Sequence, residues 1–503
     1  MAELTGLVPR WEWRTFGQDF GSAEQVFARL TPTGVQDSDE VYLYAGQVGR
    51  VVKLRDGLMD VKALKAVDAH GLEQWVPVMK EGFPIDAGSV HRVYEELQLE
   101  VPPLERDRYT LDQLMAEVLE PSGVHEVAIS KHRVRYRLGG CSAELTDLEV
   151  AGHDLRTIAI ESEDPAAVVA AVQEAGLGNR LNHNFNQGLA AVLEDEGPRF
   201  AVIDVGTNSV KFHAAERSSD GSWRTVVDRA EMTRLGEGLD QTGSISDPAL
   251  ERTVDAIKEM IAEAKEHRVL VVSVVGTAAL RLADNRDEVV QRILAETGAT
   301  VEVISGEEEG RLAYLAVKAE LGFKPGSLVV FDTGGGSSQF TFGAGDEVSE
   351  RFSVNLGAVR ITEQFGLDHA VSQETLGAAL SEIAASLTEL DGRPRPEALV
   401  GMGGAVTNIT AVRHALATYD PEIVQGTVLD RTEVDRQIEM YRARSADDRR
   451  SIVGLQPKRA EVILAGACIV RTVMEKLGQE TLTVSDRGLR HGVLRERFSL
   501  HSG

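Results

Sequence analysis

The pattern of apolar and polar positions changes once along this chain, near residue 195. Before that point many segments alternate with a period of two, as at 41–56 and 134–151, which predicts strands with one apolar and one polar face. After it, short runs rich in Val and Ile alternate with helical patterns such as 248–267 and 374–390. The sequence therefore predicts a β-rich first part and a second part with α/β layers.

The length of 503 residues predicts about three structural units. In the second part, two segments read as strand, Asp-x-Gly turn and strand, which indicates an internal duplication with an interdomain cleft. The predicted domains are residues 1–195, 198–325 and 326–503.

Composition limits the class of protein and its partners. Hydrophobic residues make up 43% of the chain and charged residues 26%, as in globular proteins. The net charge of −26 argues against a nucleic-acid partner, so that any polyanion site must be a local cluster of Lys and Arg. No basic and apolar leader and no long uncharged apolar run are present, so we expect a cytoplasmic protein without a membrane partner.

Two loops of the second part follow buried strands and begin with Asp, at 204–209 and 332–338. Their glycine and hydroxyl residues can turn backbone N–H groups toward an anion. Either loop alone is equally well explained as a hairpin turn, but two loops facing one another predict a clamp for a phosphate chain. A third loop, 401–407, opens a helix and is a weaker anion site. The predicted phosphate-binding residues are Gly206, Thr207, Asn208, Ser209, Gly334, Gly335, Gly336, Ser337, Ser338, Gly403 and Gly404.

Three further features of this part suggest chemistry on phosphate. Asp204 and Asp332 are predicted metal ligands, because Mg²⁺ prefers carboxylate and phosphate oxygens, with Mn²⁺ as the alternative ion. Arg281 falls on the first turn of a predicted helix, where its guanidinium can grip a phosphate in bidentate fashion. The acidic run 307–309 opens another helix, where the helix dipole alone would favour carboxylates.

In this order the motifs resemble the Ppx/GppA phosphatase family, which contains exopolyphosphatases and guanosine pentaphosphate phosphohydrolases. The resemblance covers roughly residues 198–498 and rests on IDVGTNS, VGTAALR, ISGEEEGRLAY, LVVFDTGGGSS, VNLGAVRITE, GMGGAVTN and VSDRGLRHGVL. It implies a two-lobe α/β, ribonuclease-H-like fold of the sugar kinase, actin and chaperone superfamily, in the short form without a further helical domain, and a homodimer. It also implies that Glu309, with Glu308 as its neighbour, positions the attacking water.

One position departs from the family pattern. Family exopolyphosphatases carry Glu where this chain has Gln339, and an amide cannot serve as a carboxylate base. The related nucleoside triphosphate diphosphohydrolases have Gln there, so that Glu309 is predicted to act as base while Gln339 orients water. This change leaves substrate preference and rate open.

Cations alternate along one segment of the first part, 131–137, which period two places on one strand face. A solvated outer face would explain one such strand, whereas several in one acidic protein favour an anion-lined channel. The order of these segments is similar to the CYTH, or triphosphate-tunnel, superfamily of closed barrels. That resemblance implies metal-binding carboxylates, but the first is replaced by Arg10, and Glu144, Asp147, Glu149, Glu161 and Glu163 are the remaining candidates. The predicted polyphosphate-binding residues are Arg10, Arg14, Lys53, Arg55, Lys131, Arg133, Arg135 and Arg137.

The fold class predicted is therefore α+β and multidomain, an antiparallel barrel followed by a two-lobe phosphatase. The predicted activity is a Mg²⁺-dependent exopolyphosphatase that releases orthophosphate while the barrel binds the polymer. Hydrolysis of pppGpp or of nucleoside triphosphates, and a polyphosphate or alarmone sensor with weak catalysis, are the alternatives.

Overall fold

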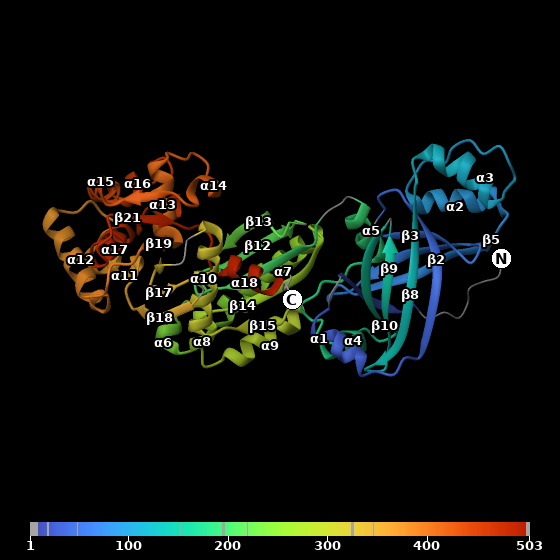
Figure 1. Cartoon of the computed structure of the whole chain (residues 1–503), viewed down its shortest axis with the longest axis horizontal. Coiled ribbons are helices and arrows are strands. Elements are labelled where there is room, and N and C mark those ends of the chain that lie inside the picture. Colours follow the sequence, from blue (N-terminus) through green and yellow to red (C-terminus); the bar gives the residue numbers. More distant parts are fainter. Residues whose placement is uncertain are drawn as a thin grey trace. The chain divides into compact units, whose positions relative to one another are not determined.

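The structure is a computed structural model, and it describes residues 9–17, 20–47, 49–150, 152–193, 197–218, 220–322, 326–345 and 347–498. The chain divides into two compact units, Met1–Val303 and Ile304–Gly503. The first contains a closed barrel and a five-stranded sheet, and the second contains a six-stranded sheet (Figure 1). This confirms the predicted fold class. The predicted domain limits at residues 195 and 325 lie outside the described residues, and the division into three domains stays a prediction.

The barrel closes through eight antiparallel strands in the order β1-β10-β9-β8-β2-β3-β4-β5. Side chains alternate between its inner and outer face, so that Lys131 and Arg133 are buried inside while His132 between them is exposed. The strands are β1 Trp11–Gly17, β2 Gly34–Tyr44, β3 Arg50–Arg55, β4 Leu58–Val67, β5 Glu73–Gly82, β8 His125–Leu138, β9 Cys141–Val150 and β10 His153–Ser162.

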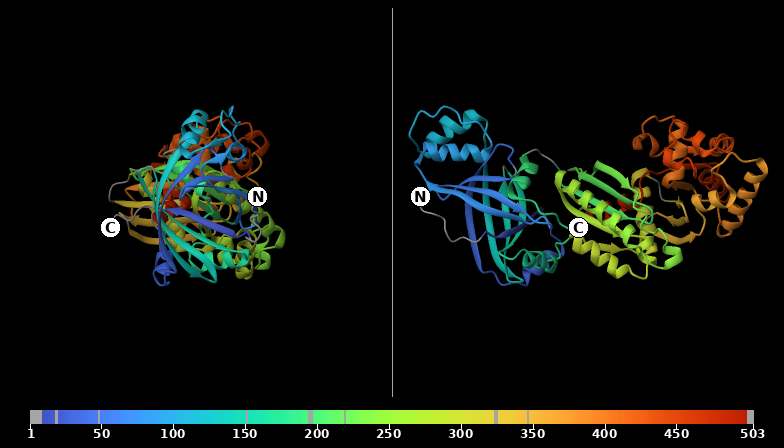
Figure 2. Two further views of the ribbon diagram at one scale, coloured as in Figure 1. Left: turned by 90° about the vertical axis from the view of Figure 1, so that its right-hand side faces the viewer. Right: turned by 180° about the vertical axis from the view of Figure 1, so that it is seen from behind.

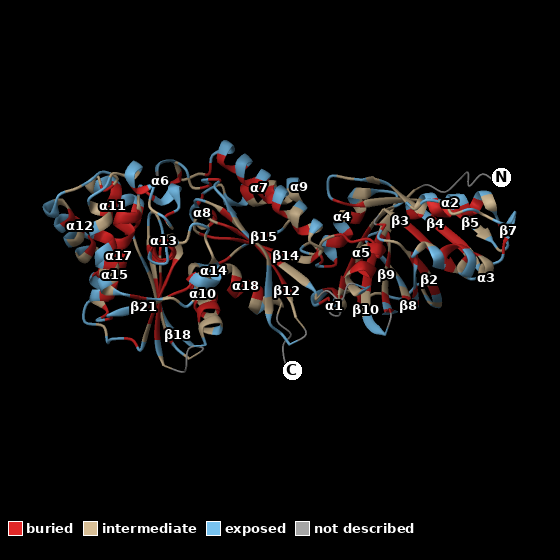
Figure 3. Cartoon of the chain, turned by 90° about the horizontal axis from the view of Figure 1, so that it is seen from above, coloured by how far each residue is buried: buried red, intermediate tan, exposed pale blue. Residues whose placement is uncertain are grey.

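Helices cover the outer face of the barrel in two places. The helices α1 (Ser22–Ala28) and α4 (Pro165–Glu174) pack over outward apolar side chains that include Trp13 and Ile160. A second group, α2 (Ala87–Leu97) and α3 (Leu111–Leu114) with the short strands β6 (Ile85–Asp86) and β7 (Arg108–Tyr109), packs on β3 and β4 and is drawn in light blue to cyan in Figure 2. Figure 3 shows the buried sides of these elements turned toward one another.

A short segment joins the barrel to the five-stranded sheet of the same unit. Its main chain bonds to the strand Val269–Gly276 of that sheet, from Leu181 N–H to Leu270 O at 3.0 Å and from Val272 N–H to Asn179 O at 2.8 Å. Toward the barrel, His183 N–H donates to Arg14 O at 2.8 Å. The buried imidazole of His183 lies 2.6 Å from Val269 O. The barrel is therefore hydrogen-bonded to the neighbouring sheet and not only tethered to it.

The two sheets share one topology. The first has the order β13-β12-β11-β14-β15, with β11 antiparallel to β12 and parallel to β14. The second has the order β18-β17-β16-β19-β21-β20, with β16 antiparallel to β17 and parallel to β19. These strands are β11 Arg199–Val205, β12 Val210–Arg217, β13 Trp223–Glu231, β14 Val269–Gly276, β15 Val301–Val303, β16 Ser327–Thr333, β17 Ser338–Ala344, β18 Glu347–Val354, β19 Ala398–Met402, β20 Val428–Asp430 and β21 Thr481–Val484. The shared order agrees with the internal duplication read from the sequence.

Helices pack on both sheets and bury apolar cores against them. In the first unit α7 (Asp247–Glu266) and α9 (Arg286–Thr297) contribute to this core. In the second unit the larger core lies between the sheet and a helical layer, while α10 covers Val330 and Val400 on the other face. The helices of this unit include α10 Gly306–Leu321, α11 Ala358–Phe365, α12 Gln373–Ser386, α13 Gly403–Arg413, α15 Arg431–Arg442, α17 Ile463–Lys476 and α18 Leu489–Phe498. No helix in the described part of the chain is long and apolar enough to cross a membrane.

Candidate functional site

The loop 204–209 of the first unit is shaped to bind an anion. Gly206 N–H donates to Ser209 O at 3.1 Å and closes the turn. The Thr207 carbonyl accepts a hydrogen bond from Gly236 N–H at 2.9 Å, which holds the loop from its other side. Among the described residues, the N–H groups of Thr207, Asn208 and Ser209 donate no hydrogen bond. Unbonded N–H groups on successive residues form a concave site for phosphate oxygens.

The loop 332–338 of the second unit repeats this construction. Gly334 N–H donates to Ser337 O at 2.9 Å, as at the matching positions of the first loop. Its carbonyls are held by the start of α11, because Ala358 N–H donates to Gly334 O at 3.0 Å and Val359 N–H to Gly335 O at 2.9 Å. Within the described residues, the N–H groups at 335–337 donate no hydrogen bond. Both loops therefore present free backbone donors while their carbonyls are bonded.

The side chain of Ser338 does not face the anion site. Its hydroxyl is fully buried, donates to Leu356 O at 2.7 Å and lies 3.2 Å from Thr333 Oγ1. The Ser338 side chain therefore holds the loop on the strand beneath it, and the predicted part of Ser338 in phosphate binding, which stays a prediction, would fall to its backbone.

The two aspartates occupy matching positions at the ends of β11 and β16. Asp204 is only 4% exposed, its Oδ1 has no hydrogen-bond partner, and its Oδ2 lies 3.5 Å from Lys211 Nζ. Asp332 is paired across the hairpin with Gln339, in the register that pairs Asp204 with Lys211. A buried carboxylate oxygen without a partner fits a ligand for a hard cation.

The third loop lies directly beside the second. A Cβ at Gly403 would lie 2.1 Å from Asp332 Oδ1, so that only glycine fits there. A Cβ at Gly404 would lie 2.6 Å from the guanidinium of Arg459, which is exposed and has no partner within the described residues. The sequence analysis missed Arg459, which comes from a segment more than fifty positions further along the chain.

The acidic turn at the start of α10 holds one of its glutamates in an ion pair. Ser305 caps the helix by accepting from Glu308 N–H, and its carbonyl accepts from Glu309 N–H at 3.0 Å. The Glu308 carboxylate forms a bidentate pair with Arg311 at 2.7 and 2.8 Å. Hydrogen bonding from Arg311 lowers the pKa of Glu308. Arg311 also lies 2.6 Å from Glu496, so Glu308 belongs to a structural ion-pair network.

Two glycines of this turn leave room for an arginine that the sequence analysis also missed. A Cβ at Gly310 would lie 2.2 Å from Arg351 Nε, and one at Gly306 would lie 2.9 Å from its Nη1. The guanidinium of Arg351, which belongs to β18, is therefore packed against the helix turn that carries Glu309. The predicted phosphate ligand Arg281 lies in the first unit on α8 (Ala278–Leu282), one turn after the end of β14.

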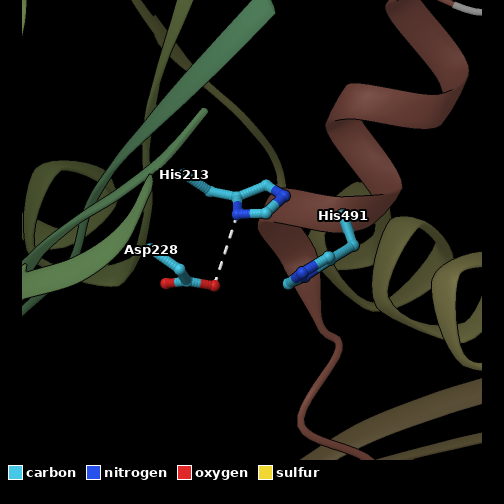
Figure 4. A group of neighbouring side chains, drawn as sticks. All are labelled: His213, Asp228 and His491. Atoms are coloured by element: carbon cyan, nitrogen blue, oxygen red, sulfur yellow. Dashed lines mark ion pairs between the residues drawn. The ribbon is translucent and has the colours of Figure 1, made fainter. Parts of the chain in front are cut away.

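The first unit also holds a buried histidine beside a carboxylate. His213 on β12 is paired across the sheet with Asp228 on β13, and its Nδ1 lies 3.3 Å from Asp228 Oδ2 (Figure 4). The sequence offered no signal for this pair, because neither residue belongs to a motif.

The inside of the barrel is apolar at one end and basic at the other. At the apolar end the helix α5 (Phe185–Leu193) inserts Phe185 and Leu189 among inward side chains that include Phe16 and Val127. The Phe185 ring stacks on Tyr42 at 4.7 Å between centroids. At the basic end the lumen holds a cavity of about 230 Å³, and Phe185 forms part of its wall. We call this space the barrel cavity.

Six of the eight predicted polyphosphate-binding residues line the barrel cavity, namely Arg14, Lys53, Arg55, Lys131, Arg133 and Arg135. The other two do not. Arg10 pairs with Glu161 at 2.9 Å and is 52% exposed, and Arg137 is exposed at the strand end, 3.4 Å from Gly140 O. Lys62, which was not among the predicted residues, lines the cavity from β4.

Glu40 organises the basic end from behind the cavity wall. It is 1% exposed, and its Oε2 lies 2.9 Å from Lys53 Nζ and 3.1 Å from Lys131 Nζ. Burial alone would raise the pKa of Glu40, but the charges of Lys131 and Lys53 outweigh it and hold this pKa at about 2. Burial, and then the charge of Lys53, lower the pKa of Lys131. A phosphate group in the cavity would oppose both effects on the lysine.

The remaining carboxylate candidates of the barrel differ in their surroundings. Glu144 lines the cavity, whereas Asp147 is exposed and pairs with Arg156 at 3.0 Å. Glu161 lines the cavity as well, and Glu149 and Glu163 are exposed outside it.

Comparison with known proteins relates the second part of the chain to a phosphatase family. Residues 215–501 match the Ppx/GppA phosphatase family. Exopolyphosphatase 1 of Mycobacterium leprae is 28% identical over 59% of this chain and 88% of its own length. A bifunctional 3-dehydroquinate synthase/phosphatase of Fusobacterium nucleatum is 28% identical over 59% of this chain, which spans 46% of that protein.

Two further matches extend this picture. A guanosine-5′-triphosphate,3′-diphosphate pyrophosphatase of Photobacterium profundum is 31% identical over 60% of each chain. The crystal structure of the Aquifex aeolicus member of the Ppx/GppA family covers 61% of this chain and 99% of that protein, with 33% identity and a TM-score of 0.56.

Proposed function

This chain belongs to the Ppx/GppA phosphatase family, and from that premise we propose that it is an exopolyphosphatase that releases orthophosphate from the end of inorganic polyphosphate. The observation that carries the proposal is the pair of glycine loops, 204–209 and 332–338, each with unbonded N–H groups after a strand that delivers Asp. A chain of phosphates offers anionic groups at regular spacing, and these loops suit such groups. The exopolyphosphatase relative supports this choice of substrate.

In this proposal the protein catalyses phosphoryl transfer by positioning and by charge stabilisation. The loop N–H groups bind phosphate oxygens, and Arg281 neutralises charge that develops on the transferred group. Glu309 aligns the attacking water and accepts its proton, as its place in the family motif implies, while Glu308 is held by Arg311. Gln339, next to Asp332 in the hairpin register, orients water by its amide.

Asp204 and Asp332 are the residues that would hold Mg²⁺, or Mn²⁺ in its place. The unpartnered, buried Oδ1 of Asp204 fits such a ligand. The ion, when bound, supplies positive charge to the phosphate oxygens.

The barrel in this proposal binds the polymer and raises its effective concentration for the catalytic residues. Seven basic side chains and three carboxylates line the barrel cavity, which supports binding of a polyanion. We expect the protein to act in the cytoplasm as a homodimer, by analogy with its family.

The second candidate substrate is pppGpp or another nucleoside polyphosphate, which the relative from Photobacterium profundum favours. The two are separated by measuring phosphate release from long-chain polyphosphate, tripolyphosphate, pppGpp and ATP. We expect long-chain polyphosphate to have the highest kcat/KM, and a preference for pppGpp would replace the first proposal by the second.

A further inference from the structure

Every carboxylate that lines the barrel cavity already contacts a cationic side chain. Arg14 lies between two of them, with its Nε 2.9 Å from Glu12 Oε1 and its Nη2 3.1 Å from Glu144 Oε1. The third, Glu161, pairs with Arg10 at 2.9 Å. Each of these carboxylates is therefore paired with a cationic side chain of the protein itself.

The guanidinium of Arg14 is fixed in this position. The Nη1 of Arg14 donates to Thr157 Oγ1 at 3.4 Å, and the guanidinium carbon lies 5.6 Å from the centre of the Phe185 ring. The backbone N–H of Arg14 donates to Asn182 Oδ1 at 2.6 Å. The side chain is 12% exposed. An arginine held on so many sides keeps its place between Glu12 and Glu144 without a ligand.

A divalent cation needs several carboxylate oxygens gathered at one point. Among the described residues of the barrel, no three acidic or histidine side chains offer ligand atoms within 4.8 Å of one another. Arg14 occupies the space between Glu12 and Glu144, two of the three carboxylates that line the cavity. This arrangement gives the cavity a permanent positive charge where a metal ion would otherwise be bound.

We propose that the barrel binds a phosphate chain without a divalent cation, and that Arg14 takes the place of the metal. The inference rests on the proposed function, in which the barrel binds polyphosphate. The charge of the cavity favours such a ligand, because seven basic residues and three carboxylates line it, a surplus of four positive charges. When the carboxylate of Glu40 behind the cavity wall is counted as well, the surplus is three positive charges. The ligand is thus an inorganic or organic oligophosphate in its metal-free form.

The test is calorimetric titration of inorganic tripolyphosphate into the full chain, in EDTA and in Mg²⁺. The chain carries Glu309→Ala so that the probe is not consumed. Lys62→Gln removes an exposed cavity cation that has no partner within the described residues. Lys65→Gln, on the same strand but outside the cavity, is the matched control. We expect binding in EDTA that Lys62→Gln weakens about tenfold, as for the loss of one charge-assisted hydrogen bond, and that Lys65→Gln leaves within twofold.

A second variant tests the role of Arg14 itself. Arg14→Gln releases Glu12 and Glu144, so that binding in EDTA should fall at least tenfold and Mg²⁺ should restore part of it, while Arg14→Lys retains most of the affinity. A merely structural arginine would give no rescue by the metal. If the site that Lys62→Gln weakens appears only with Mg²⁺, the inference is overturned and the barrel still binds polyphosphate. If Lys62→Gln has no effect in either buffer, the proposed role of the barrel is wrong as well.

Discussion

Replacing Glu40 by Gln removes the carboxylate that holds the basic end of the barrel together. The ordinary pKa of 4.5 falls to about 2 in the folded chain, which corresponds to about 3 kcal/mol of stability at neutral pH, since a tenfold change in equilibrium is about 1.4 kcal/mol. Because the folded pKa is the lower one, this stability is fully present above pH 4.5 and is lost as the pH falls toward 2. Glu40→Gln should therefore cost about 3 kcal/mol at pH 7, as for breaking a buried ion pair.

Hydrogen exchange of peptides from β8 measures this loss locally, without assuming that the whole chain unfolds in one step. Exchange in Glu40→Gln should be faster by about a hundredfold, and tripolyphosphate should slow it more than in the wild type, because a phosphate would neutralise Lys53 and Lys131. Val35→Ala, at a position of the same strand that is 60% exposed, is the control. Unchanged exchange in Glu40→Gln, or equal protection of both proteins by tripolyphosphate, would show that Glu40 does not hold Lys53 and Lys131 in this way.

Three further outcomes follow from the structure. Glu309→Gln should lower kcat for phosphate release about a thousandfold with little change in KM, while Glu307→Gln, an exposed neighbour, stays within twofold; equal losses would contradict the assignment. Gly403→Ala places a Cβ 2.1 Å from a carboxylate oxygen and should abolish activity, whereas Gly377→Ala, with nothing within 4 Å, should not. Burial lowers the pKa of His183 to about 4, so the protection of the peptides around β14, that is, their exchange corrected for the intrinsic amide rate at each pH, should fall as the pH drops from 6.5 toward 4, and constant protection would argue against a role of His183 in holding the barrel to the sheet.

Much of the barrel was predictable because period two is a local property. It placed Lys131 and Arg133 on one face, and closure of the barrel turned that face inward. Arg137 belongs to the same alternating set of β8, but this strand extends beyond the cavity and Arg137 lies outside it. The alternation does not tell how far a strand extends past a cavity. The insertion of Phe185 depends on a contact with Tyr42, more than a hundred positions away, which no local pattern contains.

In the second part of the chain, too, local features were predictable and contacts between distant residues were not. Each glycine loop was found because its residues are consecutive, and the register then places Gln339 opposite Asp332. Arg459 was missed because it reaches Gly404 from a distant turn. The pairing of Glu308 with Arg311 follows helical spacing of three residues, a signal that was present in the sequence and was overlooked in favour of the acidic run.

The most direct test of the proposed function is phosphate release by the full chain from long-chain polyphosphate and from tripolyphosphate, compared with Glu309→Ala and with Lys62→Gln. Substitutions serve better than removal of the barrel, since the segment at 179–181 is bonded to β14. We predict that Glu309→Ala abolishes release from both substrates and that Lys62→Gln slows release only from the long chain. Turnover of tripolyphosphate that survives Glu309→Ala and is lost in Lys62→Gln would contradict it, because the barrel would then be the enzyme.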